Sequence, residues 1–181
     1  VSHKPFPTGR AAQGGISLVQ KIKSRGVTAD HVDSIILRAP PIIKRLVGRP
    51  IRSRLTANYA RLCFQYSGAL TLINGDVGLK DFTEDALTQS QVHELGARIQ
   101  VENDGNPDPA AFGPQTIIAT LKTGEVFEET IEHLFGSPDW PMSRDQHLSK
   151  FRACCAFGWG EPDARAEDEL IQLTDSLETL D

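Results

Sequence analysis

The longest mostly uncharged stretch of this 181-residue chain runs from residue 61 to residue 79. Its apolar residues recur at helical spacing, and Asn74 followed by Gly75 is a typical helix stop. The apolar positions are Leu62, Phe64, Tyr66, Ala69, Leu70 and Ile73. A membrane-spanning helix needs about 20 largely apolar residues, whereas this stretch contains Arg61 and several polar side chains. We therefore predict a buried central helix around which the other segments pack, and no membrane span.

The overall composition is that of an ordinary globular protein, with 39% hydrophobic and 24% charged residues. The net charge of -5 argues against a nucleic-acid binder, because such proteins present a basic face. The three cysteines, Cys63, Cys154 and Cys155, do not make an even disulfide framework, and there is no CxxC or HExxH motif. We expect a cytoplasmic protein with no metal site and no cofactor.

One local exception to the acidic balance lies at residues 44–54. This segment, called the basic segment below, contains Lys44, Arg45, Arg49, Arg52 and Arg54. Such a cluster could meet phosphate, an anionic substrate or an acidic partner surface. A solvated loop with scattered ion pairs is the simpler interpretation of the same charges.

The rest of the chain predicts helices and a few short strands. Further helices are expected at residues 11–25, 42–47, 90–99, 144–156 and 162–180, and strands at residues 32–39 and 100–102. The small residues at the start of the first helix, Ala11, Ala12, Gly14 and Gly15, would let another backbone or a ligand come near. Residues 116–122 alternate, Thr123 and Gly124 turn the chain, and residues 126–131 return as a second strand. The predicted class is α+β, a small antiparallel sheet with a β-hairpin packed against several helices.

The segment of residues 4–13 is the informative one for chemistry. Lys4 beside two prolines, then Thr8, Arg10 and Gln13 at a glycine-rich helix start, bring cations and hydrogen-bonding groups to a positive helix end. This combination suits a carboxylate. The alternative is that Lys4 is a frayed terminal side chain and the prolines are a rigid lead-in. The histidines follow no catalytic pattern, and residues 9–15 match no nucleotide-binding motif.

Four motifs resemble, in chain order, the C-terminal half of the MmgE/PrpD family. They are Lys-Pro-Phe-Pro-Thr-Gly-Arg-Ala at residues 4–11, Ala-Arg-Leu-Cys-Phe-Gln-Tyr at 60–66 running into Ala-Leu-Thr-Leu-Ile-Asn-Gly at 69–75, Gly-Leu-Lys-Asp-Phe-Thr at 78–83, and Lys-Phe-Arg at 150–152. The family includes 2-methylcitrate dehydratase, cis-aconitate decarboxylase and iminodisuccinate epimerase. The order and spacing of the motifs are more specific than any one of them.

The resemblance implies a cofactor-independent lyase or isomerase that abstracts a proton next to a carboxylate of a small di- or tricarboxylic acid. It implies that residues 1–158 form the smaller α+β domain and that residues 159–181 form an amphipathic helix returning towards a missing N-terminal helical domain. Family members are commonly homodimers. The chain alone is then expected to be inactive, because the missing domain supplies the general base.

By the same resemblance Lys4 corresponds to an active-site lysine, with Thr8, Arg10, Gln13 and Tyr66 expected to bind substrate. Many members carry a histidine where this chain has Gln13, and a glutamine can orient a carboxylate or water but cannot shuttle a proton. Tyr66 could hydrogen-bond the substrate or simply pack. The alternative function, from a different class, is a non-catalytic α+β module that docks an acidic partner through the basic segment.

Overall fold

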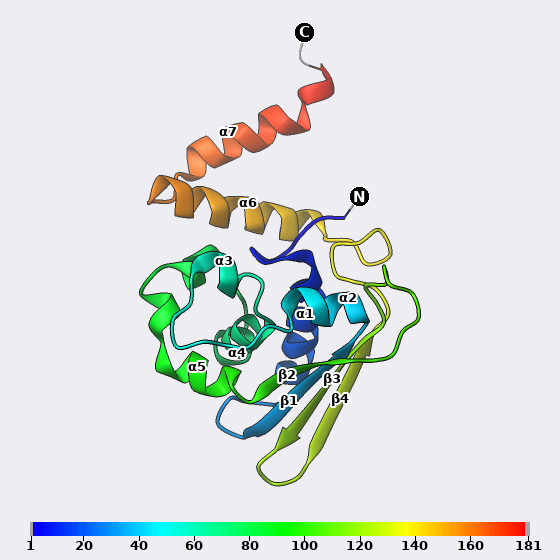
Figure 1. The fold of residues 1–181 in the computed structure, drawn as a ribbon. Helices are drawn as coiled ribbons and strands as arrows, with labels where there is room; N and C mark the ends of the chain where they lie inside the picture. The colour runs from blue at the N-terminus through cyan, green and yellow to red at the C-terminus, as the bar shows by residue number, and fades with distance from the viewer. Residues whose placement is uncertain (1, 180–181) are drawn as a thin grey trace. The chain divides into compact units, whose positions relative to one another are not determined.

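The computed structural model describes residues 2–179, which form two compact units that divide between Pro141 and Met142. The first unit holds the sheet and most of the helices, and the second is helical (Figure 1). The boundary expected between residues 158 and 159 marks where the chain would return towards a helical domain outside these residues, so it stays a prediction. Within the described residues, no helix is both long enough and apolar enough to cross a membrane.

The sheet of the first unit has four strands in the order β2-β1-β3-β4 (Figure 1). They are β1 (Val32–Ala39), β2 (Ile99–Asn103), β3 (Gln115–Leu121) and β4 (Val126–Ile131). The α+β class and the β3-β4 hairpin packed against helices are confirmed. One pair differs from the predicted antiparallel sheet, because β1 and β2 run parallel and the sheet is mixed. A parallel neighbour requires a long crossover, and residues 40–98 supply it with helices.

Helices lie on both sides of β1 in the sequence. They are α1 (Arg10–Ser24), α2 (Pro41–Val47), α3 (Ala57–Ala60), α4 (Phe64–Asn74) and α5 (Ser90–Gly96), with short 3-10 helices η1 (Leu79–Phe82) and η2 (Ala86–Thr88). The first helix packs against α4, β3 and β4, while α4 also packs against α5 and β2 (Figure 1). The inward face of the sheet, with Ile35, Leu37, Ile117 and Ala119 fully buried, forms the core with these helices.

The predicted central helix is α4, and it ends at Gly75 with a positive φ of 91°. Its residues from Phe64 to Leu72 are buried on nearly every side, Gln65 being half-buried, so α4 has no solvated face of its own. The small residues at the start of α1 serve this packing. A Cβ on Gly15 would lie 2.3 Å from Cε2 of Phe64, and one on Gly14 would lie 2.6 Å from Oε1 of Gln115. Side chains, rather than another backbone, therefore approach α1 at these positions.

The second unit contains α6 (Arg144–Trp159), α7 (Ala164–Asp175) and the 3-10 helix η3 (Leu177–Thr179). Ser143 and Gln146 form a capping box at the start of α6. The guanidinium of Arg152 lies 3.0 Å from Asp168 and 3.6 Å from Glu167 on α7. The predicted apolar stripe on the last helix is exposed at Leu170 (43%), Leu173 (52%) and Leu177 (66%), and Leu180 lies outside the described residues.

Candidate active site

The residues that precede α1 are held to the body of the first unit at three places. The backbone N–H of His3 donates to the carbonyl oxygen of Gly136 at 2.8 Å, and that of Gly9 donates to Arg61 at 3.0 Å. Between them, both backbone polar groups of Phe6 bond to the side chain of Gln13. We call residues 3–9 the N-terminal segment. Its backbone is fixed along its length, which argues against a frayed lysine at position 4.

Lys4 lies between the attachments at His3 and Phe6. Its side chain is exposed, whereas Phe6, two residues later, is only 6% exposed. Gly136 makes the first attachment possible, because a Cβ there would lie 2.4 Å from the carbonyl oxygen of His3. The fold therefore fixes the backbone of Lys4 and leaves its ammonium group facing solvent.

Gln13 is buried, with 1% of its surface exposed. Its Oε1 accepts from the N–H of Phe6 at 3.1 Å, and its Nε2 donates to the carbonyl oxygen of Phe6 at 3.2 Å and to Oγ1 of Thr8 at 2.7 Å. A carboxamide has two N–H donors, so both are already used within the chain. In this conformation Gln13 has no donor left for a substrate carboxylate.

Thr8 is also turned inward, at 3% exposure. Its hydroxyl accepts from Gln13 and lies 3.4 Å from the carbonyl oxygen of Gly9. Its backbone N–H donates to the carbonyl oxygen of Phe6 at 2.8 Å, which closes a tight turn over Pro7. Thr8 and Gln13 thus shape the segment that carries Lys4.

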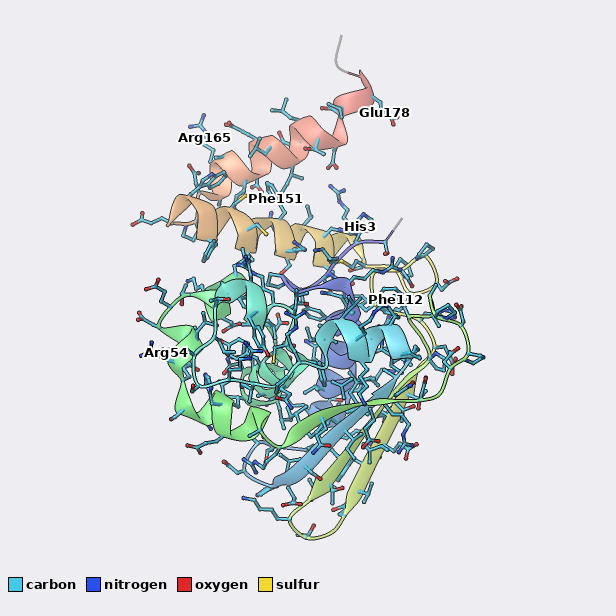
Figure 2. The ribbon with its side chains drawn as sticks, viewed as in Figure 1. His3, Arg54, Phe112, Phe151, Arg165 and Glu178 are labelled. Carbon is cyan, nitrogen blue, oxygen red and sulfur yellow. The ribbon has the colours of Figure 1, made fainter. Side chains whose placement is uncertain are left out.

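Arg10 begins α1 and its side chain is exposed. The centre of its guanidinium lies 4.8 Å from the ring centroid of Phe112, a cation–π contact that orients it (Figure 2 labels Phe112). The residue before it, Gly9, gives α1 no side-chain cap, so the first turn keeps free N–H groups and a positive end. Lys4 and Arg10 are therefore the exposed cations that lead into this helix.

Tyr66 lies on α4 and is fully buried. Its hydroxyl is 2.6 Å from the carbonyl oxygen of Asp81 and 3.2 Å from that of Ala86, in η1 and η2. Burial, with a smaller contribution from the nearby Asp81 carboxylate, raises the pKa of Tyr66 to about 12. The structure brings Thr8, Arg10 and Gln13 together with the N-terminal segment, whereas the hydroxyl of Tyr66 bonds elsewhere. This arrangement favours the packing interpretation of Tyr66.

Arg61 is the residue at this site that the sequence did not single out. Its carbonyl oxygen receives the N–H of Gly9, and its guanidinium lies 5.1 Å from the ring centroid of Phe82. The one feature of the sequence that could have indicated Arg61 is its position, because it is the charged residue at which the long uncharged stretch begins. Its backbone bond to Gly9, however, joins two segments that are far apart in the sequence.

Two other features bear on the earlier expectations. In the basic segment, Lys44, Arg45, Arg52 and Arg54 are exposed, and the guanidinium centres of Arg49 and Arg52 lie 5.2 Å and 4.6 Å from the ring centroid of Tyr59. Figure 2 shows Arg54 pointing outward. Across residues 2–179, no group of three or more His, Cys, Asp or Glu side chains is placed to hold a metal ion.

The chain matches one protein family over most of its length. The family model of the MmgE/PrpD C-terminal domain matches residues 6–176. The chain is similar to cis-aconitate decarboxylase of Mus musculus, with 29% identity over 163 residues, 84% of this chain and 32% of that protein. It is also similar to the mitochondrial 2-methylcitrate dehydratase of Yarrowia lipolytica, with 25% identity over 133 residues, 68% of this chain and 25% of that protein.

The chain thus spans about a third of the length of these relatives or less. The cis-aconitate decarboxylase of Homo sapiens repeats the pattern, at 28% identity over 84% of this chain and 30% of that protein. The region that the family model matches, residues 6–176, includes α1, the whole sheet and α6. The chain belongs to the MmgE/PrpD family, as its C-terminal domain.

Proposed function

We propose that the chain is the C-terminal domain of a lyase or isomerase that abstracts a proton next to a carboxylate of a small di- or tricarboxylic acid. The observation that carries the proposal is the family match over residues 6–176, with relatives named as a decarboxylase of cis-aconitate and a dehydratase of 2-methylcitrate. The exposed cations of Lys4 and Arg10 support it, because they suit an anionic substrate.

The proposed chemistry needs a base, an acid for the leaving group and a cation near the carboxylate that gains charge when the proton leaves. Lys4 and Arg10 supply the cations. The backbone of Lys4 is fixed, and the cation–π contact with Phe112 orients the guanidinium of Arg10 at the start of α1 before substrate arrives. Neither cation is an obvious base at neutral pH, so the base comes from another part of the complete protein.

The complete protein proposed here has a larger helical domain on the N-terminal side and acts as a cytoplasmic homodimer. The relatives are about three times as long as the matched region, which leaves room for that domain. The exposed leucines of α7 provide an apolar face for it, with residues 159–181 as the connecting segment. On this proposal the isolated chain binds acids weakly and turns none over.

The experiment is a proton-exchange assay on the full-length protein in heavy water. Deuterium uptake into citrate, methylcitrate, cis-aconitate and iminodisuccinate is followed by proton NMR. Uptake into one of these acids, or into its product, establishes the reaction class and narrows the substrate. A folded protein that exchanges none of the four would contradict the proposal.

The basic segment supports a second candidate, an acidic-partner module. Four of its five cations are exposed, and no carboxylate of the described residues lies within salt-bridge distance of any of them. Binding of a glutamate-rich peptide that weakens with salt and is lost in Lys44→Glu/Arg45→Glu would favour this module. Exchange activity that survives in the same double variant would favour the enzyme.

A further inference from the structure

We propose that Gln13 is a positioning residue that fixes the N-terminal segment, and that it neither binds substrate nor transfers a proton. The inference rests on the proposed function for the role of Lys4, but the contacts of Gln13 stand without it. The resemblance to the MmgE/PrpD family implies a substrate-binding residue at this position. The structure assigns the side chain to the protein itself.

The first step is the geometry of the carboxamide. An amide side chain carries an acceptor and a donor side by side, as a peptide group does. Gln13 uses this match to pair with both backbone groups of Phe6, at 3.1 Å and 3.2 Å. The second N–H reaches Oγ1 of Thr8 at 2.7 Å, on the other side of Pro7. The N–H of Thr8 already closes the turn over Pro7 at the carbonyl oxygen of Phe6, and the side chain of Gln13 ties both ends of this turn to α1.

The second step concerns which residue types can do this. The two ring nitrogens of histidine point in diverging directions, and in the neutral ring one donates while the other accepts. An imidazole at position 13 could bond to one backbone group of Phe6 but not to both, and it could not also donate to the hydroxyl of Thr8 as Gln13 does. Glutamine is thus suited to hold the turn, whereas histidine is suited to move a proton. This chain has glutamine at position 13, the residue type suited to hold the turn.

The third step connects the turn to Lys4. Lys4 is two residues from Phe6 and one from His3, whose N–H is bonded to Gly136. Losing Gln13 would leave the buried N–H of Phe6 without its acceptor, while the carbonyl oxygen of Phe6 keeps the N–H of Thr8, and the segment would move to bring the Phe6 N–H to water. The segment would then keep only the attachments at His3 and Gly9, and the ammonium group of Lys4, between them, would sample more positions. A cation that is no longer held in advance binds a carboxylate more weakly.

The first test needs no activity. Hydrogen exchange at the Phe6 amide is measured by NMR in the full chain, in wild type, Gln13→Met and Gln20→Met. Gln20 is a matched control, because it is on the same helix but bonds to Gly75. We expect exchange at Phe6 to be at least tenfold faster in Gln13→Met and unchanged in Gln20→Met, with the Ile117 amide protected in all three.

Equal exchange at Phe6 in wild type and Gln13→Met would overturn the proposal. Should Gln13→Met fail to fold, as unprotected Ile117 would show, Gln13→Glu replaces it. An ionised glutamate keeps an acceptor for the N–H of Phe6 but lacks both donors, so the segment loses two of its three contacts with residue 13 and exchange at the Phe6 amide should still rise about threefold or more above wild type. A Phe6 amide that exchanges at the wild-type rate in that variant would also overturn the proposal.

The second test uses the exchange activity of the full-length protein. Gln13→Met should raise KM about tenfold, because Lys4 is no longer held in place. The pKa values read from the pH dependence of kcat should not change, because the substitution removes no titrating group. Gln13→Glu should recover part of the affinity if it recovers part of the Phe6 protection. A shifted kcat profile, or an unchanged KM, would contradict a positioning role. An inactive wild-type protein would count against the proposed function, while the amide measurements would still decide the role of Gln13.

Discussion

The hydroxyl of Tyr66 lies 2.6 Å from the backbone carbonyl oxygen of Asp81, which ties the central helix α4 to η1. The carbonyl oxygen of Ala86, at 3.2 Å, adds η2 to the same group. The ring packs against Phe82, with the two centroids 6.0 Å apart. One buried side chain therefore organises the connection between α4 and α5.

Tyr66→Phe should lower the free energy of unfolding by about 1–2 kcal/mol, because the two carbonyl oxygens lose their donor while the ring still fits. Turnover of the full-length protein should stay within twofold of wild type if Tyr66 only packs. Urea denaturation and exchange kinetics measure the two quantities. A large loss of turnover with unchanged stability would restore the substrate-binding interpretation.

Stability should also fall at alkaline pH through the same residue. The pKa of Tyr66 is raised to about 12 in the folded chain, against 10.0 for an ordinary tyrosine. The folded state therefore keeps its proton where the unfolded state loses one, so the contribution is complete below pH 10 and disappears as pH rises towards 12. The expected loss is about 2–3 kcal/mol. The denaturation midpoint should fall between pH 9 and pH 11.5 in wild type, and it should fall less in Tyr66→Phe.

Lys4→Ala in the full-length protein should reduce substrate exchange by at least about 100-fold, the range expected when a charged group is removed from an active site. The melting temperature should not change, because the side chain is exposed. Lys122→Ala is the matched control, since Lys122 is an exposed lysine in the hairpin turn. Equal exchange rates in the two variants would remove Lys4 from the site.

Gly15→Ala should destabilise the chain by about 1–3 kcal/mol, because its methyl group would overlap the Phe64 ring at the centre of the core. Gly158→Ala is the opposite case. Nothing lies within 4 Å of a Cβ at Gly158 in α6, so alanine should stabilise that helix by roughly 0.5–1 kcal/mol. Urea midpoints and helical circular dichroism compare the pair. A tolerated Gly15→Ala would mean that α1 and α4 can separate.

The three thiols should react in a fixed order with Ellman's reagent. Cys154 is exposed and should react first. Burial raises the pKa of the Cys63 thiol, which donates to the carbonyl oxygen of Arg49, so Cys63 should react only on unfolding. Partial desolvation, and then Glu167, raise the pKa of Cys155, which should be slower than Cys154. Cys154→Ser should remove the fast phase, and a fast phase that remains would contradict the assignment.

Much of the fold could be predicted because its signals are local. Strand β1 has the predicted bounds, the β3-β4 hairpin follows from alternation and a Thr-Gly turn, and Gly75 ends α4 as expected. The parallel pairing of β1 and β2 could not be predicted in this way. It depends on where a crossover of nearly sixty residues places β2, and a strand of five residues carries no sign of its partner.

The site was predicted less completely, for a related reason. Lys4 and Arg10 are exposed cations, and their residue types alone suggest an anion. The role of Gln13 depends on a turn over Pro7 that brings Phe6 and Thr8 back to α1, and the sequence gives no register for such a turn. Tyr66 was ambiguous because its partners, Asp81 and Ala86, lie in irregular 3-10 turns.

The residue that caps the end of α1, Arg25, has a further effect on the sheet. Arg25 donates to the backbone carbonyl oxygen of Glu128 on β4 at 3.2 Å and forms an ion pair with Glu129. Strand β4 is the last in the strand order, and an edge strand is where another chain can add by backbone pairing. A strand from a second copy would have to displace this guanidinium and bring its own glutamates against those already there. The hairpin is thereby guarded against the intermolecular pairing that begins fibril growth.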